Sequence, residues 1–198
     1  MNNRAVTKNV LIAMAILAVA AISIWLLVMQ KPAVPVALQD MGGDFQLQSS
    51  SGPVSLHDFR GKVTLVYFGY THCPDICPMA LGVMAGAMQQ VGAPLADKVA
   101  GLFVSVDPRR DTPALLGQYA SFFDKRIVGV TGTSQQLDNI AAGWRVDYAV
   151  PDQPADTNYS VEHSTFIYMV NPDGKIADLF DEKTDPAVIA GKMRHWLK

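Results

Sequence analysis

Two cysteines, Cys73 and Cys77, are the only thiols in the 198-residue chain. They follow an apolar run, residues 63–68, that predicts a buried strand, and they precede a segment with the apolar periodicity of a helix. Amide groups at the N-terminal end of a helix favour a thiolate and lower the pKa of a cysteine. If both residues lie in the first helical turn, their spacing puts the two sulfurs on one side.

A close pair of cysteines in an oxidising compartment forms a structural disulfide, a redox pair or a metal site. Thioredoxin-type oxidoreductases have two residues between the cysteines, whereas Pro74, Asp75 and Ile76 stand between them here. The added residue widens the turn, and the charge of Asp75 opposes thiolate formation, which is unfavourable for a fast oxidant. Two converging soft thiolates suit Cu(I), which often accepts an imidazole as a third ligand.

Four histidines are available as that third ligand. We expect His57, in a polar turn, and His195, in the last helix, to be solvated, and the ring of His72 to point away from Cys73. His163 begins a strand after a long loop, a position that lies near the dithiol turn in a thioredoxin-like sheet. A histidine at such a position is more often only hydrogen-bonded, so the residue types alone leave the third ligand open.

Two other groups have both a structural and a functional interpretation. Met79, Met84 and Met88 offer soft thioethers, but their spacing follows the buried face of the helix, which favours core filling. The segment 107–113, with Asp107, Arg109, Arg110 and Asp111, is either a charged patch or a solvated turn in which Thr112 caps a helix that starts at Pro113.

Residues 10–29 form an apolar stretch of 20 residues without a charge. At about 1.5 Å per residue, a helix of this length spans the roughly 30 Å hydrocarbon core of a membrane. Arg4 and Lys8 precede it, which favours a cytoplasmic N-terminus. A cleaved signal peptide is the alternative, but its apolar core is usually about 7–15 residues long, and Pro35-Val36-Ala37 is a poor cleavage site.

The predicted organisation is a cytoplasmic tail (1–9), a transmembrane anchor (10–29), a linker (30–39) and one globular domain (40–198). The chain has 16 Lys and Arg against 18 Asp and Glu, and no basic block follows the anchor, which argues against a nucleic-acid partner. The N-terminus lacks an Arg- and Ser-rich transit segment, which favours a bacterial inner membrane, with the domain in the periplasm, over a mitochondrial membrane.

Strands and helices alternate along the globular domain, which predicts an α/β fold with a mixed central sheet. The expected strands are residues 63–68, 102–106, 127–130, 165–170 and 175–180, and the expected helices follow Cys77, Thr112, Ser134 (as far as Gly143) and Asp185. A dithiol at the end of the first central strand is the thioredoxin-like arrangement. A hairpin within residues 45–56 and the segment 146–160, with a strand at 146–150, would be additions to it.

Four segments, in this order, resemble the SCO/SenC family of membrane-anchored copper chaperones, and the similarity covers about residues 40–197. They are Tyr67-Phe68-Gly69-Tyr70-Thr71-His72-Cys73-Pro74-Asp75-Ile76-Cys77-Pro78, Ser105-Val106-Asp107-Pro108-Arg109-Arg110-Asp111-Thr112-Pro113, Val130-Thr131-Gly132-Thr133, and His163-Ser164-Thr165 followed by Asn171-Pro172-Asp173-Gly174-Lys175. Glu162 departs from the family, which usually has Asp before the histidine, but the acidic character is kept.

The resemblance implies a thioredoxin-like fold and copper bound by Cys73, Cys77 and His163. It also implies a role in assembling the Cu(A) centre of cytochrome c oxidase subunit II, with a periplasmic copper donor or thiol reductant as a further partner. Family members are also argued to reduce the cysteines of that subunit, so a thiol–disulfide reductase that uses Cys73 and Cys77 is the alternative. The sequence does not separate these roles, nor does it show whether Cu(II) is held besides Cu(I).

Two weaker interpretations complete the set. A peroxiredoxin-like enzyme places a Thr and a Pro ahead of a single peroxidatic cysteine, an arrangement that this sequence lacks. A purely structural disulfide between Cys73 and Cys77 is the other.

Overall fold

The computed structural model describes residues 14, 16–20, 22, 38–151 and 159–198. It divides the chain into two compact units, Met1–Val36 and Ala37–Lys198. The described residues of the first unit are helical and exposed. No helix in the described part of the chain is long and apolar enough to cross a membrane. Most of the predicted tail, anchor and linker lies outside the described residues.

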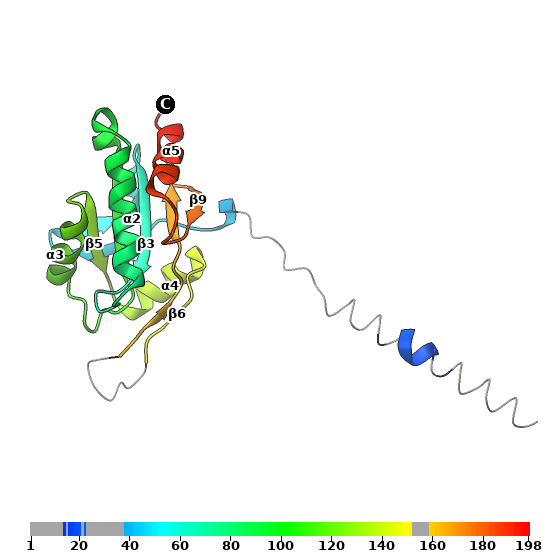
Figure 1. Cartoon of the computed structure of the whole chain (residues 1–198). Helices are drawn as coiled ribbons and strands as arrows, with labels where there is room; N and C mark the ends of the chain where they lie inside the picture. Colours follow the sequence, from blue (N-terminus) through cyan, green and yellow to red (C-terminus); the bar gives the residue numbers. More distant parts are fainter. Residues whose placement is uncertain (1–13, 15, 21, 23–37, 152–158) are drawn as a thin grey trace, which may run out of the picture. The chain divides into compact units, whose positions relative to one another are not determined.

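The second unit is an α/β domain built on a seven-stranded mixed sheet with the strand order β2-β1-β5-β4-β3-β8-β9 (Figure 1). Strands β3, β4 and β5 are parallel, and the other pairs are antiparallel. The strands are β1 Gln46–Ser49, β2 Gly52–Ser55, β3 Val63–Gly69, β4 Val99–Ser105, β5 Ile127–Thr131, β8 Ile167–Val170 and β9 Ile176–Phe180. The N-terminal hairpin and the mixed sheet are therefore confirmed.

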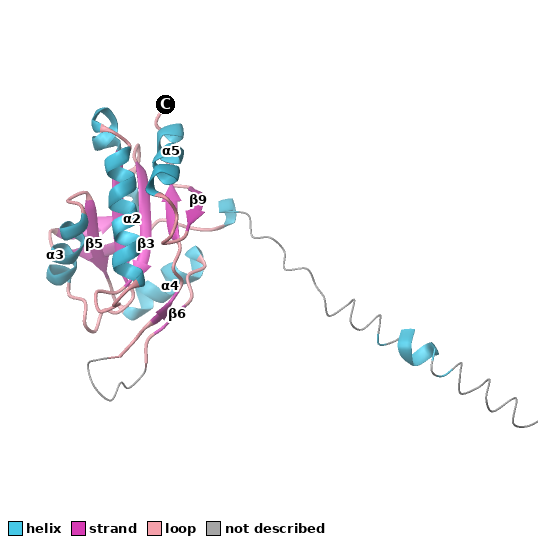
Figure 2. Cartoon of the chain, in the orientation of Figure 1, coloured by secondary structure: helices cyan, strands magenta, loops and turns pink. Residues whose placement is uncertain are grey.

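The described part of the second unit also contains four α-helices and three short 3-10 helices (Figure 2). They are α2 Ile76–Gln90, α3 Pro113–Phe123, α4 Ser134–Trp144 and α5 Pro186–Trp196, with η1 Leu38–Asp40, η2 Leu56–Phe59 and η3 Ala93–Lys98. Helix α5 follows the last strand and η1 precedes the first. Successive residues of a strand point to opposite faces of the sheet, and every residue of β3 is buried, so both faces are covered along this strand. Tyr67 and Gly69 face Cys77 of α2, whereas Phe68 packs against Trp144 of α4.

The start and the end of α4 differ from the prediction. Thr133, not Ser134, is its N-cap, because Gln136 closes a capping box with Thr133. The helix also passes the predicted end at Gly143, and its C-cap is Arg145 in the left-handed conformation.

The predicted strand at residues 146–150 is shorter than expected and lies outside the main sheet. It is β6, Tyr148–Ala149, which pairs antiparallel with β7, Glu162–His163. We call β6, β7 and residues 150–151 and 159–161, which lie between the two strands in the described part of the chain, the imidazole arm. This arm corresponds to the predicted addition to the thioredoxin-like core, and it carries His163.

Candidate metal centre

The dithiol segment leaves the carboxyl end of β3, the edge of an α/β sheet where ligands usually bind. Cys77 lies in the first turn of α2, but Cys73 lies in the turn before the helix, so the two thiols do not share one helical turn. The backbone N–H of Cys77 donates to Cys73 Sγ at 3.4 Å. Both thiols are free, Cys73 is half-buried and Cys77 is buried.

The sulfur of Cys77 is pressed against the end of β3. A Cβ atom at Gly69 would lie 2.7 Å from Cys77 Sγ, so this close approach requires glycine. The hydroxyl of Tyr67 donates to the same sulfur at 3.9 Å. Burial raises the pKa of the Cys77 thiol, which corrects the expectation that the helix end lowers it, because a buried thiolate loses its hydration. A metal ion must therefore displace a proton from Cys77.

His163 meets the two thiols from β7. Its Nε2 lies 3.4 Å from Cys77 Sγ, and the ligand atoms of Cys73, Cys77 and His163 all lie within 4.8 Å of one another. The Nδ1 atom lies 2.9 Å from the carbonyl oxygen of Ser164, which can only accept, so Nδ1 carries the proton and Nε2 presents its lone pair to the sulfurs. Burial lowers the pKa of His163, which keeps the ring neutral.

Aromatic packing fixes the orientation of the imidazole. Tyr67 and Tyr70 both meet the ring edge-on, with centroids 6.1 and 5.7 Å from that of His163. A cavity of about 360 Å³ opens beside the histidine and gives solvent and partners access to it. Besides His163, its lining consists of Asp147, Tyr148, Ala149, Glu162 and Ser164.

The other three histidines are not in the group of possible metal ligands that Cys73, Cys77 and His163 form in the described part of the chain. His57 and His195 are exposed, as predicted. The Nδ1 atom of His72 lies 3.1 Å from the hydroxyl of Thr71, which agrees with the expectation that this ring points away from Cys73.

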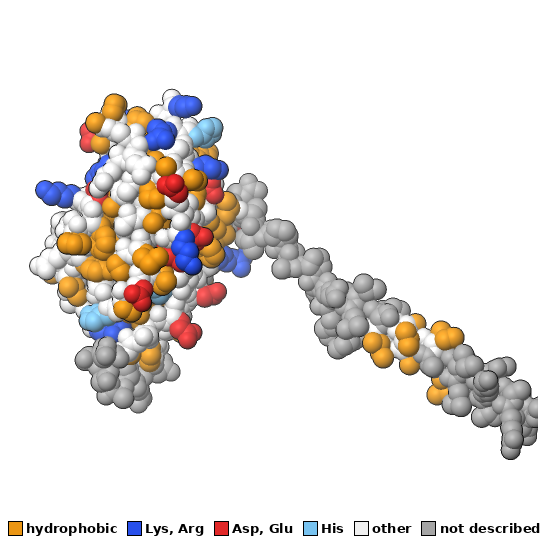
Figure 3. Space-filling model, viewed as in Figure 1, with side chains coloured by type: hydrophobic (Ala, Val, Ile, Leu, Met, Phe, Trp, Pro, Cys, Tyr) orange, Lys and Arg blue, Asp and Glu red, His pale blue; other side chains and the backbone are white. Residues whose placement is uncertain are grey.

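The core assignment of the methionines is correct for Met84 and Met88, which are buried, but wrong for Met79, whose side chain is 44% exposed. Met79 follows Cys77 by two residues and therefore faces outward at the end of α2 that carries the site. Figure 3 shows hydrophobic side chains gathered on the face of the domain that carries α2. Met79 thus adds an exposed apolar side chain to the end of α2 that carries Cys77.

The charged segment after β4 lies next to the candidate metal site. The sequence alone did not connect the two. Asp107 and Asp111 are fully buried, so neither a charged surface patch nor a solvated turn describes them. The predicted Thr112 cap of α3 is confirmed. The position of Asp107 and Asp111 in the sequence could have indicated this. They follow β4, the neighbour of β3, and the carboxyl ends of parallel strands lie at one edge of the sheet.

Comparisons with known proteins agree with this architecture. The SCO1/SenC family model matches residues 35–198. The mitochondrial Protein SCO2 homolog of Bos taurus is 38% identical over 154 residues, 77% of this chain and 58% of that protein. The SCO2-like protein of Rickettsia felis is 32% identical over 194 residues, which are 93% of this chain and 94% of that protein.

The domain also resembles solved structures. The structure of Bradyrhizobium japonicum ScoI with copper bound has a TM-score of 0.71 at 37% identity, and the match covers 79% of this chain and 99% of that one. The predicted thioredoxin-like fold is thus the fold of the Sco structures. The chain spans little more than half the length of the mitochondrial relatives, such as the 58% of the bovine protein. It belongs to the SCO1/SenC family.

Proposed function

We propose that this protein binds Cu(I) through Cys73, Cys77 and His163 and delivers it to the Cu(A) centre of cytochrome c oxidase subunit II. The observation that carries the proposal is the convergence of three ligand atoms, two sulfurs and one nitrogen, within 4.8 Å. Thiolates are soft ligands that select Cu(I), and imidazole also suits copper, whereas Mg²⁺ and Ca²⁺ prefer oxygen. The similar ScoI structure, solved with copper bound, supports this choice of metal.

The burial of the two thiols suggests the order of ligand exchange. Cys73 is half-buried and Cys77 is buried, so an incoming thiol of the partner reaches the Cys73 side first. The partner's thiol loses its proton as it binds the ion, and Cys73 takes up a proton as it leaves. The same exchange then replaces Cys77. No electron is transferred, and Cu(I) keeps its oxidation state throughout.

We also propose that residues 10–29 anchor the protein in a bacterial inner membrane, with the domain in the periplasm. The support is the uncharged apolar stretch of 20 residues after a short basic tail. A periplasmic copper donor or thiol reductant would then load or reduce the site.

The function is tested by titrating Cu(I) into the reduced full chain against a competing chromophoric chelator. We expect one ion per chain. Removing a residue that only orients a metal ligand typically weakens metal binding roughly tenfold. His163→Ala removes a ligand itself, so it should weaken the Cu(I) affinity by at least that much. His57→Ala, which removes an exposed imidazole, should leave the affinity unchanged. Reduced protein that does not compete with the chelator would refute the proposal.

Thiol–disulfide reduction is the second candidate, and the half-buried Cys73 favours it because this sulfur can reach a partner. Cys73 would attack a disulfide of subunit II, and Cys77 would resolve the mixed disulfide, which leaves two thiols on the partner and a disulfide here. A separate reductant would have to restore the dithiol. This reaction does not need His163. If His163→Ala supports oxidase assembly in cells while Cys77→Ser does not, reduction is the main role.

A further inference from the structure

Two buried carboxylates lie in the segment between β4 and α3, and neither is a candidate ligand. The side chains of Asp107 and Asp111 are completely shielded from solvent. Burying a charge costs several kcal/mol unless ion pairs and hydrogen bonds compensate for the lost hydration. The groups that compensate each carboxylate therefore show what it holds in place.

Asp111 holds the segment that carries the thiols. One carboxylate oxygen accepts from the backbone N–H of Thr71 at 2.9 Å and from the hydroxyl of Ser105 at 2.6 Å. The other oxygen accepts from the hydroxyl of Thr71. Thr71 stands two residues before Cys73, so Asp111 ties the dithiol segment to the end of β4.

Asp107 holds the arm that carries the imidazole. One of its oxygens accepts from the hydroxyl of Tyr159 at 2.8 Å, and the other accepts from Arg110 Nε at 2.6 Å. Arg110 in turn donates to the carbonyl oxygen of Tyr159 at 2.8 Å, and its guanidinium lies 3.5 Å from the centroid of that ring. Tyr159 stands four residues before His163, so Asp107 and Arg110 tie the imidazole arm to the same segment.

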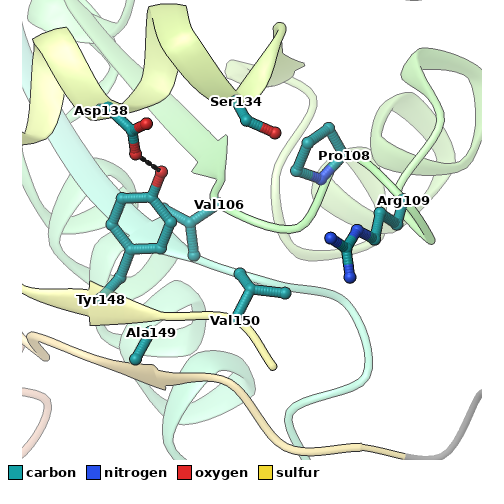
Figure 4. Close-up of a pocket in the computed structure, with 8 residues that line it drawn as sticks. All are labelled: Val106, Pro108, Arg109, Ser134, Asp138, Tyr148, Ala149 and Val150. Carbon is teal, nitrogen blue, oxygen red and sulfur yellow. Dashed lines mark hydrogen bonds between the residues drawn. The ribbon is translucent and has the colours of Figure 1, made fainter. Parts of the chain in front are cut away.

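Along β6, the imidazole arm does not pack closely against the segment after β4. A cavity of about 300 Å³ lies between the arm and the segment after β4 (Figure 4). On the arm it is lined by Tyr148, Ala149 and Val150, and on the segment by Val106, Pro108 and Arg109. Arg109 reaches across to the carbonyl oxygen of Pro151 at 2.9 Å. Ser134 and Asp138 of α4 complete the lining, and the hydroxyl of Tyr148 donates to Asp138. The arm is thus held on this side by polar bridges, from Arg109 of the segment after β4 and to Asp138 of α4.

We propose that Asp107 and Asp111 are positioning residues that together set the distance between His163 and the two thiols. The backbone N–H of Asp111 donates to the carbonyl oxygen of Asp107 at 3.0 Å, so both carboxylates belong to one turn. One carboxylate holds each half of the site, and a ligand set must be held within about 0.5 Å to be productive. This inference rests on the proposed function, because it assigns these residues to the same metal site.

A double-mutant cycle on Cu(I) affinity, measured with the full reduced chain, tests the proposal. Asp107→Asn should weaken binding about tenfold when His163 is present. In the His163→Ala background the same substitution should change the affinity by less than about twofold, because the ring that it positions is gone. Asp111→Asn should weaken binding in both backgrounds, because it acts on the thiols.

The controls separate positioning from a general loss of stability. Asp124 makes a similar bridge to Arg126, at 2.6 Å, before the amino end of β5, which is the opposite end of the sheet. Asp124→Asn should therefore lower stability without changing the Cu(I) affinity. Tyr159→Phe deletes only the hydroxyl that Asp107 accepts from, and it should reproduce the dependence on His163 if Asp107→Asn fails to fold.

Equal losses for Asp107→Asn and Tyr159→Phe with and without His163, or no loss in either background, would overturn the inference while the copper site itself stands. If the unmodified protein binds no Cu(I), the proposed function fails instead. The positioning of the thiols is then still measurable in metal-free protein as the rate of Cys73 alkylation by iodoacetamide. Asp111→Asn should change that rate at least twofold and Asp107→Asn should not, and the reverse would reject the assignment.

Discussion

At the scale of single residues, the site depends on how closely the chain lets a sulfur approach the sheet. Gly69 ends β3 on the face that α2 covers, and the absence of a side chain there leaves room for Cys77 Sγ. The ring of Phe103 closes the same space from β4. A glycine at the end of a strand thus sets the position of a candidate ligand.

Gly69→Ala should displace the sulfur of Cys77, because the new methyl group would lie 2.7 Å from it. We expect a loss of about 1–3 kcal/mol in the free energy of unfolding, measured by urea denaturation, together with weaker Cu(I) binding. Gly82→Ala, at a site in α2 with nothing within 4 Å, is the matched control and should add about 0.5–1 kcal/mol. A neutral Gly69→Ala variant would show that the sulfur can move freely.

At the scale of elements, one turn with an ion pair holds two helices to the sheet at the end opposite the site. Asp124, the C-cap of α3, pairs with Arg126 just before β5, and Arg126 also donates to the carbonyl oxygen of Met88 near the end of α2. One short turn therefore connects two helices and a strand. Its geometry depends on the ionised form of Asp124.

The stabilisation by Asp124 should depend on pH. The hydrogen bond from Arg126 holds the pKa of Asp124 below its ordinary value, so the folded state favours the ionised form. This stabilisation is present above the unfolded pKa of about 3.9 and is lost as the pH falls through the lower folded pKa. Asp124→Asn should cost roughly 1.5 kcal/mol at neutral pH, as for a hydrogen bond to a charged group. Urea titrations should show this difference shrinking below about pH 4, and a constant difference down to pH 2 would contradict the assignment.

At the scale of the whole molecule, the site lies where two distant parts of the chain meet, the dithiol segment with the start of α2 and the imidazole arm. The turn before α2 contributes Cys73, α2 contributes Cys77 and the imidazole arm contributes His163. The segment after β4 holds these parts together through Asp107 and Asp111. A mixed sheet with helices on both faces gives this edge a rigid base.

The proposed anchor makes a prediction about the complete chain. The full-length protein should sediment with membranes and resist extraction by sodium carbonate, because a helix of about 20 apolar residues inserts stably in a bilayer. Deletion of residues 1–31 should release the domain into the soluble fraction with its Cu(I) affinity unchanged. Mass spectrometry of the membrane-bound protein should find residues 1–31 intact, whereas their loss would indicate a cleaved signal peptide.

Much of the element order could be predicted from the sequence, because strands, helices and caps reflect the periodicity and chemistry of neighbouring residues. The hairpin at β1 and β2, the strand before the dithiol and the cap at Thr112 are examples. The predictions failed where long-range packing decides. Met79 matched the apolar face of a helix but is 44% exposed, and the strand predicted at 146–150 is only two residues long, Tyr148–Ala149.

The sequence by itself determined that two thiols stand where a buried strand passes into a helix, since both signals are local. Only the tertiary structure decided that His163, 86 residues from Cys77, turns its Nε2 toward the sulfurs. It also decided that Asp107 and Asp111 are buried and that the pKa of Cys77 is raised. Burial and ligand convergence depend on which segments meet at one edge of the sheet, and this is a property of the assembled layers that no local pattern of residues contains.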